Sequence, residues 1–389
     1  MSCDLQLSDK QINVCKFSCV ILTIIVIALA INLNSSDCSH YTPSLKLVIA
    51  ITRHGVRAPA YDYPTNPYSS KAHWPNGAGE LTSLGKMQMY KLGTKFREIY
   101  NGFLNENYVS SEFRSFSTLI ERTMQSAEAL LAGLYPPKSY QIWNNDLAWQ
   151  PIPVFPNYLD KEKIATTPEL CPAFTNFQKT AIKLAENKSA ESSKIIEYML
   201  RNSGFNTSSM FHLYVLWDVL TCQKYSGLEL PEWAKEVYPA PFKDVYKTPL
   251  YAFLIGNDEM VRLLAGPMVN SFIESMQKKM NDTQNKERKM LFYSSHDNTL
   301  LAILTSFGFK NIEPVQFAMT ILLELHSNSL TPSGYEIKLF FIDGTTEDRT
   351  PIQKDIPTCN SPCDFNRFFE ITNIYHKDLD FDKECLSKQ

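Results

Sequence analysis

Two short apolar runs, each leading directly into charged residues, constrain the fold of this chain more than any other feature. They cover residues 45–52 and 291–295; an Arg-His pair follows the first and a His-Asp pair follows the second. Apolar runs without polar alternation are typical of strands buried on both faces of a parallel sheet. A loop and a helical pattern follow each run, so the sequence predicts an α/β sheet with its ligand site where these strands end.

The remaining pattern predicts a core and a smaller helical part. Residues 149–247 read as helices joined by Pro-rich segments, and we expect them to form a helical cap inserted into the α/β core. The core then comprises residues 34–148 and 248–389, with a mainly parallel central sheet and flanking helices. Strand-like runs at residues 317–325 and 335–342, separated by a Ser/Asn/Pro/Gly turn, predict a hairpin.

Composition excludes some classes of function. Of 389 residues, 44% are hydrophobic and 20% charged, which is near the average of globular proteins and argues against disorder over most of the chain. The formal net charge is −3, from 38 Lys+Arg against 41 Asp+Glu. Nucleic-acid binding usually requires a basic excess to neutralise phosphates, so we do not expect a nucleic-acid partner.

The N-terminus carries a targeting segment. Residues 17–33 contain no charge; Lys10 and Lys16 precede them, and no Lys or Arg follows until Lys46. This asymmetry places the N-terminus in the cytosol and the following chain in the lumen or outside the cell. The segment is long for a signal-peptide core and short for a membrane span, so residues 1–33 are either a cleaved signal peptide or a retained signal anchor.

Sequons and cysteines agree with the secretory pathway. Asn-x-Ser/Thr sequons begin at Asn34, Asn187, Asn206 and Asn281. Six cysteines follow the targeting segment: Cys38, Cys171, Cys222, Cys359, Cys363 and Cys385. An even number in an oxidising compartment allows up to three disulfides, whose pairing the sequence leaves open. Cys359 and Cys363 lie close together in the sequence. No second pair of Cys or His residues at the spacing of zinc ligands accompanies them, so a short disulfide is favoured over a zinc site.

The loop after the first strand carries a concentrated set of catalytic groups. Arg53 and Arg57 flank His54, and the guanidinium fork of arginine matches phosphate oxygens in bidentate fashion. Gly55 would let the backbone approach an anion closely. Two neighbouring cations disfavour a protonated imidazole, and a neutral His54 could attack phosphorus to form a phosphoenzyme. A basic surface loop is the alternative.

Two further elements complete the predicted site. Asp297 could protonate the leaving alcohol if a bound phosphate raised its pKa, and His296 could hold a phosphate oxygen. Alternatively, this pair is a helix N-cap with an ordinary buried histidine. Arg122 again stands between a possible strand and a helix and would supply a third cation to the same phosphate, although a solvated pair with Glu121 would also explain it.

At this point the sequence resembles the histidine acid phosphatases of the prostatic and lysosomal type. Arg53-His-Gly-x-Arg-x-Pro59 matches the signature of this family, and His296-Asp297 matches its second motif. Residues 74–93 carry a matching pattern of Trp, Pro, Gly, Leu, Thr and Gln, and matches also occur at Leu230-Pro-x-Trp233-Ala234 and Cys359-x-Ser361-Pro362-Cys363. The resemblance extends from about residue 45 to residue 385.

The resemblance implies roles that spacing alone cannot give. His54 would be the phosphorylated nucleophile and Asp297 the proton donor, while the phosphate would be bound by Arg53, Arg57, Arg122 and His296. It also implies an α/β fold of the phosphoglycerate mutase type with a helical domain, no metal or other cofactor, and in many members a homodimer. By resemblance, Cys171 pairs with Cys385 and Cys359 with Cys363.

Some positions depart from the family pattern. Val56 stands where mammalian members carry an acidic residue, and Phe116 replaces an arginine that usually precedes the Ser-Thr pair. Cys222 matches a family cysteine whose partner is missing here, which leaves Cys222 and Cys38 without an assigned partner. No second apolar segment follows at the C-terminus, unlike in the lysosomal members.

The sequence therefore predicts a luminal or extracellular acid phosphatase that hydrolyses small phosphate monoesters through a phosphohistidine. The alternatives are a specialised phosphatase of the same family, acting on phytate, a lysophospholipid or a phosphorylated glycan, a phosphomutase or phosphotransferase, or a catalytically silent binding protein. Membrane anchorage through residues 17–33 and a homodimer are further possibilities that the sequence leaves open.

Overall fold

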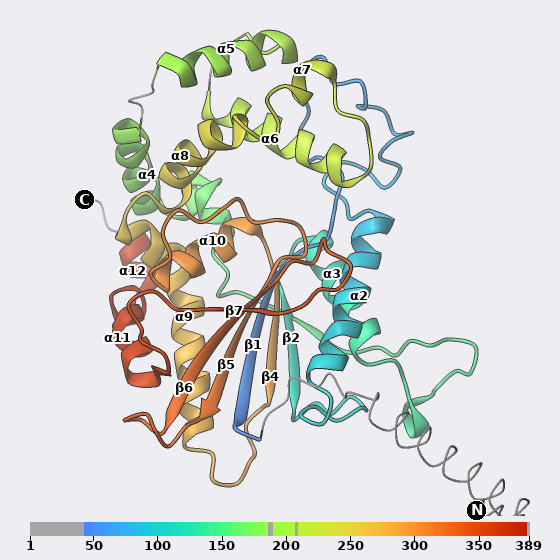
Figure 1. Cartoon of the computed structure of the whole chain (residues 1–389), viewed down its shortest axis with the longest axis vertical. Coiled ribbons are helices and arrows are strands. Elements are labelled where there is room, and N and C mark those ends of the chain that lie inside the picture. The colour runs from blue at the N-terminus through green and yellow to red at the C-terminus, as the bar shows by residue number, and fades with distance from the viewer. Residues whose placement is uncertain (1–42, 186–189, 207–208, 387–389) are drawn as a thin grey trace, which may run out of the picture. The chain divides into compact units, whose positions relative to one another are not determined.

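The computed structural model describes residues 43–185, 190–206 and 209–386. Their centre is one sheet with the strand order β3-β2-β4-β1-β5-β6-β7, and β8 pairs with β6 beside this path (Figure 1). The strands are β1 (Leu45–Arg53), β2 (Phe113–Ser117), β3 (Val154–Pro156), β4 (Met290–Ser295), β5 (Thr320–Ser327), β6 (Tyr335–Ile342), β7 (Ile352–Lys354) and β8 (Cys363–Asp364). Both apolar runs found in the sequence are thus neighbouring central strands.

The sheet is mixed, which corrects the expectation of a mainly parallel one. Strands β3, β2, β4 and β1 pair in parallel, whereas β5, β6, β7 and β8 join through antiparallel pairs. The expected hairpin is present as β5 and β6, and it adds directly to β1. A hairpin needs only a short turn, whereas each parallel pair needs a crossover, so the C-terminal part of the chain completes the sheet with antiparallel strands.

Side chains of β1 alternate between two apolar cores, which explains its uninterrupted apolar run over residues 47–51. Leu47, Ile49 and Ile51 belong to one buried cluster, and Val48 and Ala50 to the other. The first cluster lies against α9 (Asp258–Met280), α10 (Asp297–Ser306) and α11 (Phe365–His376), and the second against α2 (Ser83–Ile99) and α3 (Glu121–Leu134). Figure 1 shows these two helical layers on opposite faces of the sheet.

The remaining helices gather beyond the ends of β1 and β4 that carry the charged motifs (Figure 1). They are α4 (Pro172–Ala185), α5 (Ala190–Ser203), α6 (Met210–Tyr225), α7 (Glu232–Lys235) and α8 (Phe242–Ile255), with α12 (Phe381–Leu386) near α4. Helices α5, α6 and α8 share a separate apolar cluster. β3 lies within residues 149–247 yet pairs with β2, and α8 extends beyond them. The division into core and cap stays a prediction.

Two disulfides fix the C-terminal part of the chain. Cys171 is bonded to Cys385, and Cys359 to Cys363. Cys222 is buried and forms no disulfide among the described residues. Cys38 and the predicted targeting segment, residues 17–33, lie outside the described residues. Within the described ranges, no helix combines the length and apolar character needed to cross a bilayer.

Candidate active site

Strand register brings the charged motifs together at one edge of the sheet. Arg53 pairs with Ser295 in the parallel ladder of β1 and β4, so His54 and His296 leave neighbouring strand ends side by side. Their ring centroids lie 5.5 Å apart. β2 ends beside β4 at Ser117, and the following α3 places the Arg122 side chain against both rings. Residues far apart in sequence therefore meet because three parallel strands end together.

His54 is held with one ring nitrogen available for chemistry. The imidazole is buried, and its Nδ1 lies 2.9 Å from the carbonyl oxygen of Gly55. A carbonyl only accepts hydrogen bonds, so Nδ1 carries the proton and Nε2 keeps its lone pair. The Nε–H of Arg122 donates to this lone pair at 3.2 Å. Burial, reinforced by Arg122 and Arg53, holds the pKa of His54 well below 6.5.

The structure explains the glycine at position 55 differently from the sequence, which suggested close approach of the backbone to an anion. A Cβ at this position would overlap the backbone carbonyl of Gly85, near the start of α2. The Gly55 N–H is also occupied, since it donates to Ser126 Oγ at 3.2 Å. Glycine is therefore required here by close packing of the loop on α2, and the expected role in anion approach is not needed to explain it.

Three arginines surround the His54 ring. Arg53 donates to the Val315 carbonyl at 2.6 Å, pairs with Asp297 at 2.9 Å and lies 4.2 Å over the Phe317 ring. Arg57 donates through both terminal nitrogens to the Asp218 carboxylate, at 3.0 and 2.8 Å. The Nε–H groups of Arg53 and Arg57 are buried and have no hydrogen-bond partner within the part of the chain that the structure describes. Buried donors of this kind are costly unless a ligand accepts from them.

Asp218 is a part of the site that sequence reasoning missed. It lies on α6, 161 positions from Arg57, and both side chains are almost fully buried. Burial alone would lower the pKa of Arg57, but Asp218 raises it well above the ordinary range. The signal available in the sequence was a single carboxylate inside the otherwise apolar stretch 213–220, because a buried charge needs a partner.

We expect Asp218→Ala to be strongly destabilising, because it leaves the Arg57 charge buried without compensation. The free energy of unfolding should fall by ~3–5 kcal/mol, measured by urea denaturation. Glu347→Ala is the matched control: its ion pair with Lys91 is exposed, and its loss should cost at most ~1 kcal/mol. Equal effects of the two substitutions would contradict a buried, structurally required pair.

His296 and Asp297 stand at the start of α10 with different environments. Burial and Arg122 lower the pKa of His296 to about 3, so the ring is neutral; its Nε2 lies 3.0 Å from Thr118 Oγ1. Withdrawal from water raises the pKa of Asp297, but Arg53 and Arg57 outweigh it, and the pKa lies below 3.8. The Asp297 side chain is 45% exposed and can exchange protons with solvent.

Asp160 stabilises the segment that carries His296 and Asp297. Asp160 accepts hydrogen bonds from Ser295 Oγ at 2.7 Å and from Thr299 Oγ1 at 2.9 Å, the residues on either side of the His-Asp motif. It thereby fixes the turn from β4 into α10. Burial and the neighbouring Asp160 raise the pKa of Glu162 to about 7, so in mildly acidic solution Glu162 is protonated and adds little charge near Asp297.

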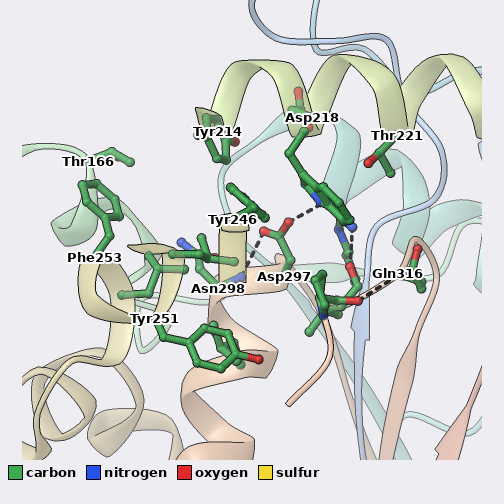
Figure 2. A pocket seen from close by; sticks show the side chains of 17 residues that line it. Thr166, Tyr214, Asp218, Thr221, Tyr246, Tyr251, Phe253, Asp297, Asn298 and Gln316 are labelled. Carbon is green, nitrogen blue, oxygen red and sulfur yellow. Dashed lines mark hydrogen bonds and ion pairs between the residues drawn. The ribbon is translucent and has the colours of Figure 1, made fainter. Parts of the chain in front are cut away.

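A cavity beside this cluster is lined in part by residues of α6 and α8. Arg53 and Asp297 line it. Side chains of α6 and α8, including Asp218, Tyr214 and Tyr246, also line it (Figure 2). The six site residues predicted from the sequence therefore lie close together. Arg53 and Asp297 line the cavity, Arg57 contacts the lining residue Asp218, and Arg122 contacts both His54 and His296. Among the described residues, no group of three or more His, Cys, Asp or Glu side chains has the arrangement of a metal site.

The sequence is similar to that of a known protein family and of several acid phosphatases. Residues 44–335 match the family model of the histidine phosphatase superfamily, branch 2. The lysosomal acid phosphatase of Homo sapiens is 30% identical over 349 residues, which cover 88% of this chain and 80% of the relative. The prostatic acid phosphatase of Homo sapiens is also 30% identical, over 357 residues that cover 90% of each protein.

Solved structures with a similar fold include bacterial phytases. The phytase from Citrobacter braakii superposes with a TM-score of 0.64 at 15% identity and covers 89% of this chain and 100% of the phytase. The apo form of Hafnia alvei phytase gives a TM-score of 0.62 at 12% identity, over 90% of this chain and 100% of that one. At such low identity these likenesses establish the α/β fold alone.

Proposed function

The chain belongs to the histidine phosphatase superfamily, branch 2, and from this premise we propose that it is an acid phosphatase that hydrolyses phosphate monoesters through a phosphohistidine. The observation that carries the proposal is a neutral, buried imidazole close enough to Arg122, Arg53 and Arg57 for all three to lower its pKa, with two arginine Nε–H donors that lack partners among the described residues. A phosphate group would accept from those donors and match three cations.

Substrate binding would exchange two contacts of the unliganded site. Arg122 now donates to Nε2 of His54, and Arg53 now pairs with Asp297. A phosphate dianion carries twice the charge of a carboxylate and would compete for both guanidinium groups, so its binding would free the Nε2 lone pair and the carboxylate together. Beside a phosphate dianion, the pKa of the released Asp297 would rise, and the carboxyl would take up a proton from solvent.

The first chemical step forms a nitrogen–phosphorus bond. The Nε2 lone pair of His54 attacks phosphorus in line with the ester oxygen, the phosphorus–oxygen ester bond breaks, and its electron pair leaves with the oxygen. Asp297 donates its proton to that oxygen, so an alcohol departs rather than an alkoxide. The arginines neutralise the charge on the phosphoryl oxygens throughout.

The second step regenerates the enzyme. Water enters the position that the alcohol left, and the Asp297 carboxylate removes a proton from it as it attacks phosphorus. The nitrogen–phosphorus bond breaks, its electron pair returns to Nε2, and inorganic phosphate is released. His54 stays neutral at acid pH because burial and the arginines keep its pKa well below 6.5, so acidity supplies the proton on Asp297 without protonating the nucleophile.

The experiment that tests this proposal is a rapid quench into alkali during turnover of a ³²P-labelled ester. A phosphoramidate survives alkali and hydrolyses in acid, so label should remain on the protein after an alkaline quench and be lost on acidification. Inorganic phosphate should form in equal amount to the alcohol. Label that never appears on the protein would refute the covalent route, and transfer without phosphate release would indicate a mutase.

We further propose that the protein enters the secretory pathway, which its two disulfides support, as a glycoprotein with a signal peptide or signal anchor in residues 1–33. Of the four sequons, those at Asn206 and Asn281 have exposed asparagines within the described residues. A homodimer is proposed from the resemblance alone. Sequencing the N-terminus of the mature protein distinguishes cleavage from retention, and a mass unchanged by an N-glycosidase would argue against glycosylation.

A further inference from the structure

One polar side chain interrupts the apolar face that α2 turns toward the core. The buried residues of this helix are Gly85, Gln88, Met89, Leu92, Gly93, Phe96 and Ile99. Gln88 is 7% exposed and is the only one of these seven with a polar side chain. A buried polar group is costly unless it is hydrogen-bonded, so this glutamine needs a partner.

The partner of Gln88 is the loop that carries His54. Gln88 Oε1 accepts a hydrogen bond at 3.0 Å from the backbone N–H of Val56, and both groups are buried. This N–H belongs to the same planar peptide unit as the Gly55 carbonyl, and in a trans peptide the two groups point in opposite directions. The Gly55 carbonyl in turn accepts from Nδ1–H of His54 at 2.9 Å. Gln88 and the imidazole therefore hold opposite sides of one peptide unit.

The peptide units on either side of this one are fixed by other groups. The preceding unit is held by Ser126 Oγ and by the Ala318 N–H. The following unit is held through the Val56 carbonyl, which accepts from the backbone N–H and the hydroxyl of Thr82 at 3.0 and 2.8 Å. Apart from the imidazole itself, Gln88 is the only residue within the described ranges that forms a hydrogen bond to the unit between them.

We infer that Gln88 is a positioning residue for the nucleophile. By accepting the Val56 N–H, it fixes the plane of the peptide whose carbonyl orients the His54 ring and keeps the ring proton on Nδ1. The Nε2 lone pair is thereby aimed at the place that phosphorus occupies in the proposed mechanism. Hydrogen bonds in such a chain polarise one another, so the bond to Gln88 also strengthens the bond between the peptide and His54. This inference rests on the proposed phosphatase function and adds to it a residue that supports the reacting atom.

The test replaces Gln88 with methionine, which has a similar length but no oxygen to accept the Val56 N–H. The peptide unit can then tilt, and the imidazole tilts with it. Because a small displacement of a reacting group costs up to ~10²-fold in rate, we expect kcat to fall about 10- to 100-fold. Arg53, Arg57 and Arg122 are unchanged, so the inhibition constant of inorganic phosphate should stay within about 2-fold of the original value.

Two further variants separate positioning from packing. Gln88→Glu keeps an acceptor oxygen in either protonation state, so its kcat should lie within about 3-fold of the original protein. Gln141→Met is the matched control, because Gln141 Oε1 also accepts a backbone N–H, that of Tyr108, at 2.9 Å. Tyr108 precedes the start of β2, whereas the site lies beyond the end of β2, so kcat should stay within about 2-fold. Unchanged kcat in a folded Gln88→Met protein, or equal losses in the Met and Glu variants, would overturn the inference.

A measurement without turnover keeps this inference apart from the phosphatase proposal. The proton NMR shift of His54 Nδ1–H, assigned by its absence in a His54→Ala variant, reports the strength of the hydrogen bond to the Gly55 carbonyl. This shift should move upfield in Gln88→Met and stay in place in Gln88→Glu. If the shift behaves in this way but the original protein hydrolyses no ester, only the phosphatase function fails. If esters are hydrolysed and the methionine variant changes neither the shift nor kcat, only the positioning role fails.

Discussion

Replacing His54 with alanine should abolish hydrolysis, with kcat falling on the order of 10⁴-fold or more. The imidazole supplies the only bond that the enzyme makes to phosphorus in the proposed mechanism, and Nε2 is its reacting atom. The three arginines remain, so phosphate should still bind and inhibit a residual reaction. Release of inorganic phosphate from a generic aryl phosphate, together with the alkaline quench, measures both effects.

A matched control is available in another histidine. His73 is exposed and hydrogen-bonded to Ser70 Oγ at 3.0 Å, away from the arginines, so His73→Ala should leave kcat within about 2-fold of the original protein. Circular dichroism and the thermal midpoint establish that the His54 variant is folded. A folded His54→Ala protein that still hydrolyses esters, or still carries alkali-stable label, would remove His54 as the nucleophile.

That these motifs lie close together could be predicted from the sequence, because each of them follows directly where a buried strand ends. The apolar runs identify β1 and β4, and the strand ends of a parallel sheet lie at one edge, so Arg53, His54, His296 and Asp297 had to come together. The hairpin β5–β6 could also be predicted, because its two strands and turn are local in the sequence. The strand ends and the hairpin could be predicted because each is encoded by a pattern within a short stretch of sequence.

What the sequence did not predict depends on contacts between distant side chains. Asp218 on α6 and Asp160, which precedes α4, each fix an element of the candidate site, yet neither stands in a local sequence pattern that identifies its partner. The antiparallel pairing of β5 with β1 likewise follows from where the chain returns, which periodicity does not encode. A carboxylate within an apolar stretch of a helix, such as Asp218 within residues 213–220, is nevertheless a usable signal, since its charge requires a partner when it is buried.

Asp297→Asn should reduce activity selectively for esters with poor leaving groups. Asparagine keeps an oxygen that can accept from the Asn298 backbone N–H, as Asp297 does at 3.0 Å, but it cannot donate a proton to an alkoxide. We expect kcat for ethyl phosphate to fall ~10²- to 10⁴-fold, the usual contribution of general acid catalysis. With 4-nitrophenyl phosphate the loss should be much smaller, because nitrophenolate leaves as a stable anion.

The pH dependence gives the same prediction a second readout. In the unliganded site Arg53 and Arg57 keep the pKa of Asp297 below 3.8, so the carboxyl is ionised and must gain its proton after the phosphate has displaced it from Arg53. In the original protein, kcat for ethyl phosphate should therefore decrease as pH rises through the pKa of Asp297 in the complex. In the Asn variant this decrease should be absent, since no proton is taken up. Equal losses on both esters, or an unchanged pH profile, would mean that Asp297 only positions Arg53 and that the leaving oxygen receives its proton from another group.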